Sequence, residues 1–280
     1  VSRPTLTDVT ALVLNGQSST GNAVPGLPMP MIRETLAGFG DCRENDRRVD
    51  TTDIDLFALG LWYEAYLANQ GLQLAGDGML IYTSRSPNST FTNDGSVLQA
   101  IRVITINSTS SPQLSDETTL ATDNPLYIHG DFNTINTKGV ALISDAVNIL
   151  SNALTTKPCG ISFFNLFRFF SASTTTVNAA LFAGHVPTTG STYSGGVHTY
   201  PRLHEDWTRR FGNTTKTLFI NGSFINLWDS EQARAEWCIG GGCYSGPTRN
   251  WGWDVRFQDP DFWPPFIPSI FSVERVGFLE

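Results

Sequence analysis

The chain between residues 72 and 151 consists of short apolar runs separated by Gly, Asn, Asp and Ser. Isoleucine, valine and threonine crowd the middle of AIRVITINST, and branching at Cβ favours a strand over a helix there. Runs of this length bounded by turn residues predict a mainly β fold, either a short-stranded β-solenoid or a wound β-sandwich. VALISDAVNILS also fits a helical face, but we predict two strands that bend at Ser144 and Asp145.

One α-helix is predicted at about 52–70, in the stretch TTDIDLFALGLWYEAYLANQ. Thr52 is the predicted N-cap, Asp55 occupies the capping-box position, and Asp53 lies in the first turn, where a carboxylate favours the helix dipole. Apolar residues recur at helical spacing, which is typical of a helix that packs against a core. These residues are Ile54, Phe57, Ala58, Leu61, Trp62 and Ala65.

The chain divides into residues 1–30 and a single β-rich body at 31–280. Residues 5–14 predict a strand, and a Gly, Pro and Ser-rich linker follows up to residue 30. This strand either begins its own domain or pairs with the sheet of a neighbouring copy. The section 197–280 is rich in Pro and aromatic residues, which excludes long helices and predicts strands and extended loops.

The stretch DNPLYIHGDFNT, residues 123–134, is the strongest candidate for chemistry. With period two, Tyr127, His129 and Asp131 share one face of a half-buried strand, and we interpret His129 and Asp131 as an outward-facing polar row. A catalytic pair would need a nucleophile or a third orienting group, and none is identifiable nearby in the sequence. Calcium is the one candidate cofactor, through the oxygen donors Asp123 and Asp131.

Other signals for an enzyme are weak, and we predict no catalytic residues. The sequence contains no P-loop, no dinucleotide fingerprint and no G-x-S-x-G elbow. His185, His198 and His204 lack zincin spacing. Carboxylates that a glycoside hydrolase or lyase would need are present, but their spacing in the sequence does not define their separation in space. The candidates are Glu205, Asp206, Asp229 and Glu231.

Charge and cysteine content indicate the compartment and exclude one class of partner. The formal net charge of −8 argues against nucleic acid, which requires a basic face. No apolar run approaches the ~20 residues needed to span a membrane. The three glycines of CIGGGC allow a tight loop closed by a Cys238–Cys243 disulfide, and Cys42 and Cys159 would pair by elimination. Disulfides predict an extracellular or cell-surface protein.

Surface features of the chain leave a carbohydrate link open. Three tryptophans near the C-terminus, Trp251, Trp253 and Trp263, are either packing anchors or a platform on which a sugar stacks. Four N-x-[ST] sequons make a glycoprotein plausible when they occur among hydroxyl-rich loops. They begin at Asn88, Asn107, Asn213 and Asn221.

A series of loose motifs in a fairly specific order resembles one family. The motifs are LATDNPLYIHGDFNT, KGVALISDAVNILSN, TTTVNAALFAGHVPT, YSGGVHTYPRLHEDW, NGSFINLW, YSGPTRNWGWDVRFQDP and VERVGF. In this order they resemble the β-rich C-terminal region of PilX-like, pilus-assembly-associated bacterial envelope proteins. The resemblance implies an exported surface protein connected with pili or other filaments, with no catalytic residues to assign. The hydrophobic N-terminal helix of a pilin is absent, which favours assembly by strand exchange.

These observations predict a structural subunit of an extracellular filament, pilus-like fibre or surface layer, whose partners are copies of itself. Residues 5–14 would pair with an open sheet edge of the next copy, as a donor strand, and bury Leu6, Val9, Leu12 and Val13. A carbohydrate-binding or polysaccharide-cleaving surface protein is the alternative. A viral or phage fibre or capsid protein is the third hypothesis.

Overall fold

The computed structural model describes most of the β-rich body. The predicted N-terminal strand, its linker, all four cysteine side chains and the sequons at Asn88, Asn107 and Asn213 lie outside the described residues. Predictions about these segments therefore stay predictions. The described residues are 31–44, 47–69, 78–85, 97–104, 114–154, 172–190, 194, 200–205, 207–208, 215–235 and 246–267.

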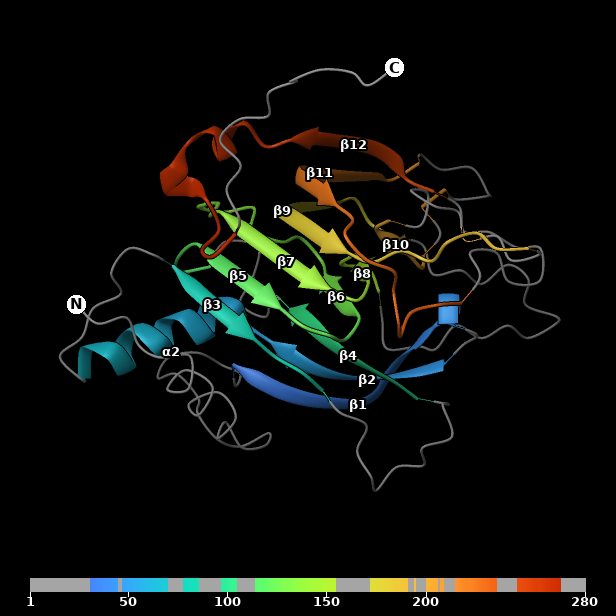
Figure 1. The fold of residues 1–280 in the computed structure, drawn as a ribbon, viewed down its shortest axis with the longest axis horizontal. Helices are drawn as coiled ribbons and strands as arrows, with labels where there is room; N and C mark the ends of the chain where they lie inside the picture. The colour runs from blue at the N-terminus through green and yellow to red at the C-terminus, as the bar shows by residue number, and fades with distance from the viewer. Residues whose placement is uncertain are drawn as a thin grey trace, which may run out of the picture.

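Two six-stranded sheets form the body (Figure 1). In spatial order, sheet A contains β1 (Ile32–Asp41), β2 (Arg47–Ile54), β4 (Val97–Ile104), β6 (Leu126–His129), β8 (Val147–Leu150) and β10 (Arg202–Leu203). Sheet B contains β12 (Thr248–Trp253), β11 (Thr217–Ile225), β9 (Thr175–Ala183), β7 (Val140–Ser144), β5 (Thr118–Ala121) and β3 (Met79–Tyr82). The prediction of a mainly β protein is confirmed.

Consecutive strands alternate between the two sheets from β2 to β11. Each strand then pairs in parallel with the next strand of its own sheet, and only β1 and β2 pair antiparallel. The predicted bend in VALISDAVNILS separates β7 in sheet B from β8 in sheet A. Short runs with turn residues between them suit such a winding, because the chain changes sheets after every strand.

The main core fills the space between the sheets. Parallel pairing in register stacks equivalent side chains into columns that run across the strands. In sheet B one column joins Ile81, Leu120, Leu142 and Leu181, all of them buried, and ends at Phe224 on β11. Each strand therefore covers the apolar side chains of its neighbour, and among the described residues no strand covers the outermost strands of the sheet on one side.

A second apolar cluster covers the opposite face of sheet A. It gathers Phe39, Val49, Leu98, Ala100, Tyr127 and Leu150. The end of β1 contributes Phe39, whose ring meets the ring of Tyr127 edge-on with centroids 4.9 Å apart. Tyr127, which the period-two pattern places on the same outward face as His129 and Asp131, is instead fully buried. The reason is tertiary, because the β1–β2 hairpin lies over a face that the alternating pattern assigns to solvent.

The single α-helix among the described residues, α2, spans Leu56–Asn69 and begins four residues later than predicted. Asp55 acts as its N-cap, since its Oδ1 accepts the Ala58 N–H at 3.0 Å. Thr52 and Asp53 belong instead to β2, which is paired on both sides by β1 and β4. Backbone pairing with two neighbours overrides the local capping signal.

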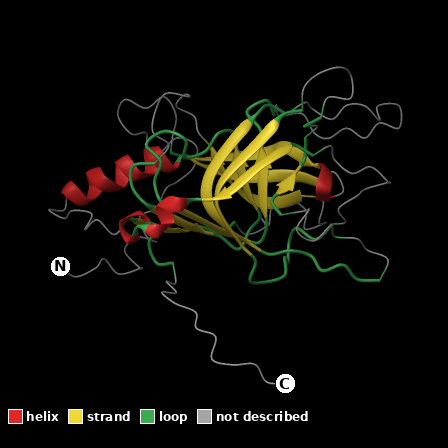
Figure 2. Cartoon of the chain, turned by 90° about the horizontal axis from the view of Figure 1, so that it is seen from above, coloured by secondary structure: helices red, strands yellow, loops and turns green. Residues whose placement is uncertain are grey.

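The two ends of the winding differ. Helix α2 links β2 to β3 at one end, where Leu56, Ala58 and Leu59 pack into the core, and β12 forms the last strand of sheet B at the other end (Figure 1). Figure 2 looks onto the β12 end. After β12, two short 3-10 helices, η3 (Val255–Gln258) and η4 (Pro260–Phe262), lead the chain back over sheet B. There the Thr119 hydroxyl donates to the Pro265 carbonyl.

Candidate assembly surface

The structure separates the residues of the predicted catalytic or calcium stretch. Asp123 precedes β6 and is exposed, whereas Asp131 follows β6, so the strand separates the two carboxylates. The Asp131 carboxylate accepts the Thr176 N–H at 2.7 Å and the Asn152 Nδ2–H at 3.0 Å. Among the described residues, no group of three His, Cys, Asp or Glu side chains could hold a metal ion. Asp131 therefore connects the start of β9 to the turn after β8.

His129 lies on the outer face of sheet A, away from the bonds that Asp131 makes. Burial lowers the pKa of His129 to about 4, and the nearby positive charge of Arg102 adds to this effect. The imidazole is therefore neutral at physiological pH. A neutral, half-buried His129 is typical of a side chain that packs on the sheet.

A polar column crosses the same outer face of sheet A. Strand register aligns one residue from each of five neighbouring strands, and all five are buried: Asp53, Arg102, Tyr127, Asn148 and Arg202. Arg102 binds Asp53 through two bonds, Nε to Oδ1 at 2.8 Å and Nη2 to Oδ2 at 2.7 Å. Burial opposes ionisation of Asp53, but Arg102 holds its pKa below the ordinary value. The sequence alone does not reveal this column, because its members are distant along the chain.

The tip of the β1–β2 hairpin closes over the column. The short helix η1 (Cys42–Glu44) forms this tip, and the Asp41 carboxylate before it accepts the Tyr127 hydroxyl and lies 3.2 Å from His204 Nδ1. Burial favours neutral Asp41, but His204 and Arg202 hold its pKa well below the usual range. These side chains are almost completely buried. A charge network without solvent access stabilises a fold and does not reach a substrate.

Arg202 joins three parts of the molecule at the hairpin tip. Its Nη2 donates to Glu44 Oε1 at 2.5 Å, and its Nη1 donates to the Ala233 carbonyl at 2.7 Å. The Ala235 N–H donates to the Glu44 carboxylate as well. We call this set, with Glu44, Arg202, Ala233 and Ala235, the hairpin clasp. It connects the first strand to residues that come after β11.

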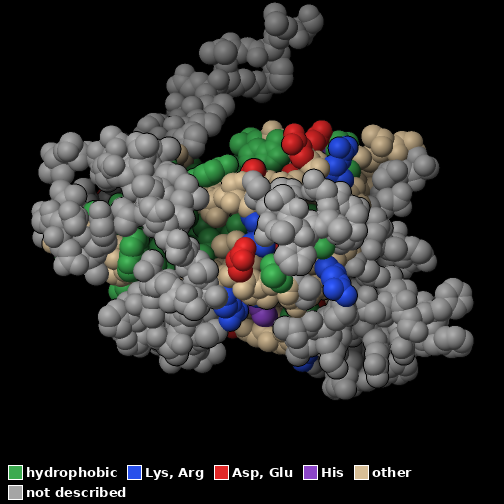
Figure 3. All heavy atoms as spheres, turned by 90° about the horizontal axis from the view of Figure 1, so that it is seen from below, with side chains coloured by type: hydrophobic (Ala, Val, Ile, Leu, Met, Phe, Trp, Pro, Cys, Tyr) green, Lys and Arg blue, Asp and Glu red, His purple; other side chains and the backbone are tan. Residues whose placement is uncertain are grey.

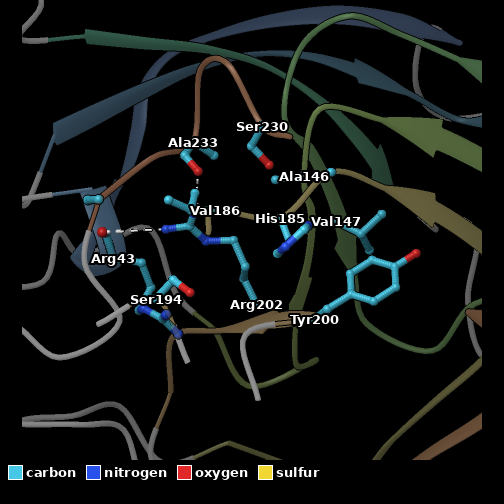
Figure 4. Close-up of a pocket in the computed structure, with 12 residues that line it drawn as sticks. Arg43, Ala146, Val147, His185, Val186, Ser194, Tyr200, Arg202, Ser230 and Ala233 are labelled. Atoms are coloured by element: carbon cyan, nitrogen blue, oxygen red, sulfur yellow. Dashed lines mark hydrogen bonds between the residues drawn. The ribbon is translucent and has the colours of Figure 1, made fainter. Parts of the chain in front are cut away.

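A small pocket lies beside the hairpin clasp (Figure 4). Arg43, His185, Ser194, Tyr200 and Arg202 are among its lining residues. Its interior has room for about one water-sized molecule, which is far below the several hundred Å³ of a typical ligand site. The pocket is therefore too small for a sugar or a nucleotide.

The carboxylates considered for glycoside hydrolysis have separate environments. Glu205 is buried and accepts both the N–H and the hydroxyl of Ser151, at 2.6 and 2.5 Å. Burial raises its pKa. Asp229 is exposed and lies 3.8 Å from His185, and Glu231 is also exposed. Asp206 and His198 lie outside the described residues.

The three tryptophans occupy different positions. Trp251 and Trp253 lie on the inner face of β12, in register with Ile220 and Gly222 of β11. The ring of Trp251 contacts Phe224, with centroids 5.3 Å apart, and the Arg249 guanidinium lies 5.2 Å from its centroid. Trp263 is anchored by a 2.7 Å bond from its Nε1 to the Phe257 carbonyl. Only Trp253 presents a largely open ring, 54% exposed.

An apolar patch marks the carboxyl ends of β11 and β12. Its members are the large side chains that the last strands leave exposed: Phe224, Leu227, Trp253 and Val255, at 37, 69, 54 and 67%. The inner-face columns that are buried in earlier strands end here, because sheet A contributes no described strand beyond β10. Exposed apolar side chains that gather at the end of a sheet are candidates for an interaction site.

The backbone edge of β12 adjoins this patch. Within the described residues β12 pairs with β11 alone, so one of its sides is unpaired. The Thr248 N–H donates to the Lys216 carbonyl, and the Asp254 N–H donates to the Gly222 carbonyl. Alternation then directs the N–H groups of residues 249, 251 and 253 away from β11. A strand with an exposed row of donors and acceptors is a template for another strand.

The sequon residue Asn221 belongs to a ladder of amides on the outer face of sheet B. Its Nδ2–H donates to Asn178 Oδ1 at 2.8 Å, and Asn178 and Asn133 each donate to the other's backbone carbonyl at 2.9 Å. Amide ladders stabilise stacked parallel strands. The Asn221 side chain is exposed but already bonded.

The coloured surface in Figure 3 shows acidic and basic side chains in small separate groups. No broad basic face is visible among the described residues in that view, in keeping with the net charge of −8. Among the same residues, no helix combines the length and apolar content needed to cross a membrane.

Comparisons with known proteins give no family assignment. No protein-family model, curated protein or solved structure matches the chain. The density of aromatic residues in the C-terminal section identifies Trp251 and Trp253 from the sequence. The period-two spacing of Arg249, Trp251 and Trp253 is the signal that could also have placed them on one face of an edge strand.

Proposed function

We propose that this protein is a structural subunit of an extracellular filament or pilus-like fibre and that its winding is a β-solenoid. The observation that supports this function is the difference between the ends. Helix α2 packs on the core at one end, whereas at the other end, among the described residues, β12 pairs on one side only and lies beside exposed apolar side chains. A contact between two unlike surfaces of identical chains does not close on itself, and it propagates as a fibre.

The β-solenoid proposal rests on the alternation of strands between two parallel sheets from β2 to β11. Solenoids require terminal caps, because each coil covers the apolar side chains of its neighbour. The column that ends at Phe224 and the exposed Trp253 are typical of an uncapped last coil. A neighbouring copy would supply the missing cover.

The sequence supports the same proposal independently. The resemblance to PilX-like envelope proteins indicates a surface protein connected with filaments, and the proposed disulfides require an oxidising compartment. Residues 5–14 are apolar and β-branched and precede a linker of 16 residues. They provide a strand that could be donated to another copy.

Electron microscopy of the purified chain tests the proposal directly. We expect the full-length protein to form fibres and the variant lacking residues 1–14 to stay monomeric with an unchanged circular dichroism spectrum. A matched control is Ser18→Asp, which adds a charge in the linker and should leave fibres intact. Full-length protein that stays monomeric at every concentration would refute the function, and fibres of normal length from the deletion variant would refute strand donation.

Carbohydrate binding at Trp253 is the second candidate function, and the open ring of this residue is the observation that favours it. Sugars stack on exposed aromatic faces. Phe224 and Arg249 already contact the ring of Trp251, so the ring of Trp253 is the one that a sugar could reach. A glycan array with the wild type and Trp253→Ala tests this candidate. Equal signals from the two proteins would remove it.

A further inference from the structure

The small pocket beside the hairpin clasp brings together segments that are distant in the sequence (Figure 4). Its walls come from η1, from β10 and from the segments after β9 and β11, through Arg43, Arg202, His185 and Ala233. His185 is half-exposed, so the pocket lies next to solvent. The interior has room for about one water-sized particle, and only a single small molecule or ion can therefore occupy it.

Arg202 carries a hydrogen-bond donor that the described fold does not use. The residue is only 6% exposed, and its Nη1 and Nη2 donate to the Ala233 carbonyl and to the Glu44 carboxylate. Its Nε–H is buried and has no hydrogen-bond partner among the described residues. Figure 4 shows this side chain running through the middle of the lining residues. A buried donor without a partner is unfavourable, so an acceptor in the pocket would stabilise the folded chain.

His185 contributes a second buried polar atom to the same lining. Its Nδ1 has no hydrogen-bond partner among the described residues, and the Asp229 Oδ1 at 3.8 Å is beyond hydrogen-bonding distance. In the tautomer that carries the proton on Nδ1, this atom is also a donor. The pocket therefore offers donors from two elements.

The charge of the lining selects the kind of occupant. Among the described lining residues, Arg43 and Arg202 are positively charged, and none carries a carboxylate. The Ala233 carbonyl in the wall already accepts from Arg202. A water molecule needs acceptors for its own protons, whereas an anion only accepts, and arginine N–H groups only donate. A cationic lining with donor groups therefore favours a small anion over water and excludes a metal ion.

We propose that this pocket binds a single halide ion, chloride under ordinary conditions, which accepts the Arg202 Nε–H. Phosphate, sulfate and organic carboxylates are larger than the space available. Glu44 binds the same guanidinium through Nη2, so the halide adds to the hairpin clasp and does not replace it. The ion would hold β10 against the segments that line the pocket. This inference goes beyond the proposed function, because it concerns the folded chain whether or not it assembles.

The chloride dependence of stability tests the site in solution. Urea unfolding of the full chain is measured while sodium chloride replaces sodium gluconate at constant ionic strength, because gluconate is too large for the pocket. An ion that binds only the folded chain raises the folding equilibrium constant about tenfold for each tenfold increase in chloride above its Kd. The urea midpoint should therefore rise with chloride. Equal midpoints in the two salts would overturn the proposal.

A double variant assigns the chloride effect to the pocket. Glu44→Met/Arg202→Met removes the Nε donor without leaving the buried Glu44 carboxylate unpaired, and we expect it to lose the rise in midpoint. Arg256→Met is the control, because it removes a guanidinium that lies outside the pocket lining and binds Asp254. This control should keep the wild-type rise. A chloride effect of wild-type size in the folded double variant would overturn the assignment.

Wild-type crystals soaked in sodium bromide locate the ion without any substitution. Bromide scatters X-rays anomalously, and we expect an anomalous peak within hydrogen-bonding distance of Arg202 Nε. A pocket that holds a water molecule without anomalous signal would overturn the proposal, as would bromide found only elsewhere on the surface. This measurement stays decisive even if the double variant does not fold.

Discussion

Replacing His129 by glutamine should remove one specific part of the pH dependence of stability. Burial and the charge of Arg102 lower the pKa of His129 from 6.5 to about 4 in the folded chain. Below about pH 6.5 the His129 ring of the unfolded chain binds a proton, whereas in the folded chain the same ring stays neutral down to about pH 4. Wild-type stability therefore contains a contribution that is complete above the unfolded pKa and is lost as the pH falls.

The size of the effect can be worked out from the two pKa values. The full shift corresponds to about 3 kcal/mol, because each pKa unit is worth about 1.4 kcal/mol. Between about pH 7 and pH 5 the wild type should lose about 2 kcal/mol relative to His129→Gln, since only part of the range is crossed. Burial also raises the pKa values of Glu44 and Glu205. These groups change stability in the opposite direction but occur in both proteins, so they cancel in the difference.

Urea unfolding of the two proteins across this pH range measures the difference. We expect the free energy of unfolding of the wild type to approach or cross that of His129→Gln as the medium becomes acidic. Titration of the His129 ring by NMR gives the folded pKa independently. Parallel stability curves, or a ring that titrates near pH 6.5, would refute the assignment of His129 to a buried neutral position.

Two further experiments, each with a second variant for comparison, test the hairpin clasp and the packing of β11 on β9. Arg202→Met removes the charged partner of the buried Glu44 carboxylate, which keeps the bonds from the Ala235 N–H, and should destabilise the protein by about 3–5 kcal/mol. The double variant Glu44→Met/Arg202→Met should recover much of that loss. Equal losses in chemical denaturation would contradict the pairing. Gly222→Ala should abolish folding, because its Cβ would lie 1.7 Å from the Ala179 carbonyl oxygen. Gly252→Ala is the control, because a Cβ at this position would have open space around it. Its midpoint of thermal unfolding should change little. Similar midpoints for Gly222→Ala and Gly252→Ala would contradict the close contact between β9 and β11.

The accuracy of the sequence predictions varies from element to element. The short apolar runs between residues 72 and 151 correctly predict strands and the bend after Ser144, because strand length and turn residues are local properties. The helix is predicted at the right place, but its predicted start is wrong, since Thr52 and Asp53 pair within sheet A. Capping preferences amount to about 1 kcal/mol and yield to backbone pairing on both sides of a strand.

The candidate site is predicted less well than the strands. The tryptophans indicate that the C-terminal section contains packing anchors or a binding surface. Composition cannot distinguish an anchored ring, such as that of Trp263, from an exposed one, such as that of Trp253. The period of PLYIHGDF assigns its polar residues to an outward row, and Tyr127 is instead buried under Phe39. Phe39 and Tyr127 lie about ninety positions apart in the sequence, so the local hydrophobic pattern around either residue does not predict their contact.

The sequence by itself determined the kind of element at each place, because side-chain branching, turn residues and period act over a few neighbouring residues. Tertiary structure alone decided which faces are covered and which strand is left unpaired. A column of side chains is buried only where another strand or a hairpin lies over it, as at Leu181, and exposed where the stack stops, as at Trp253. The unpaired side of β12, as far as the described residues show it, is thus a property of strand order, which depends on pairing between distant segments.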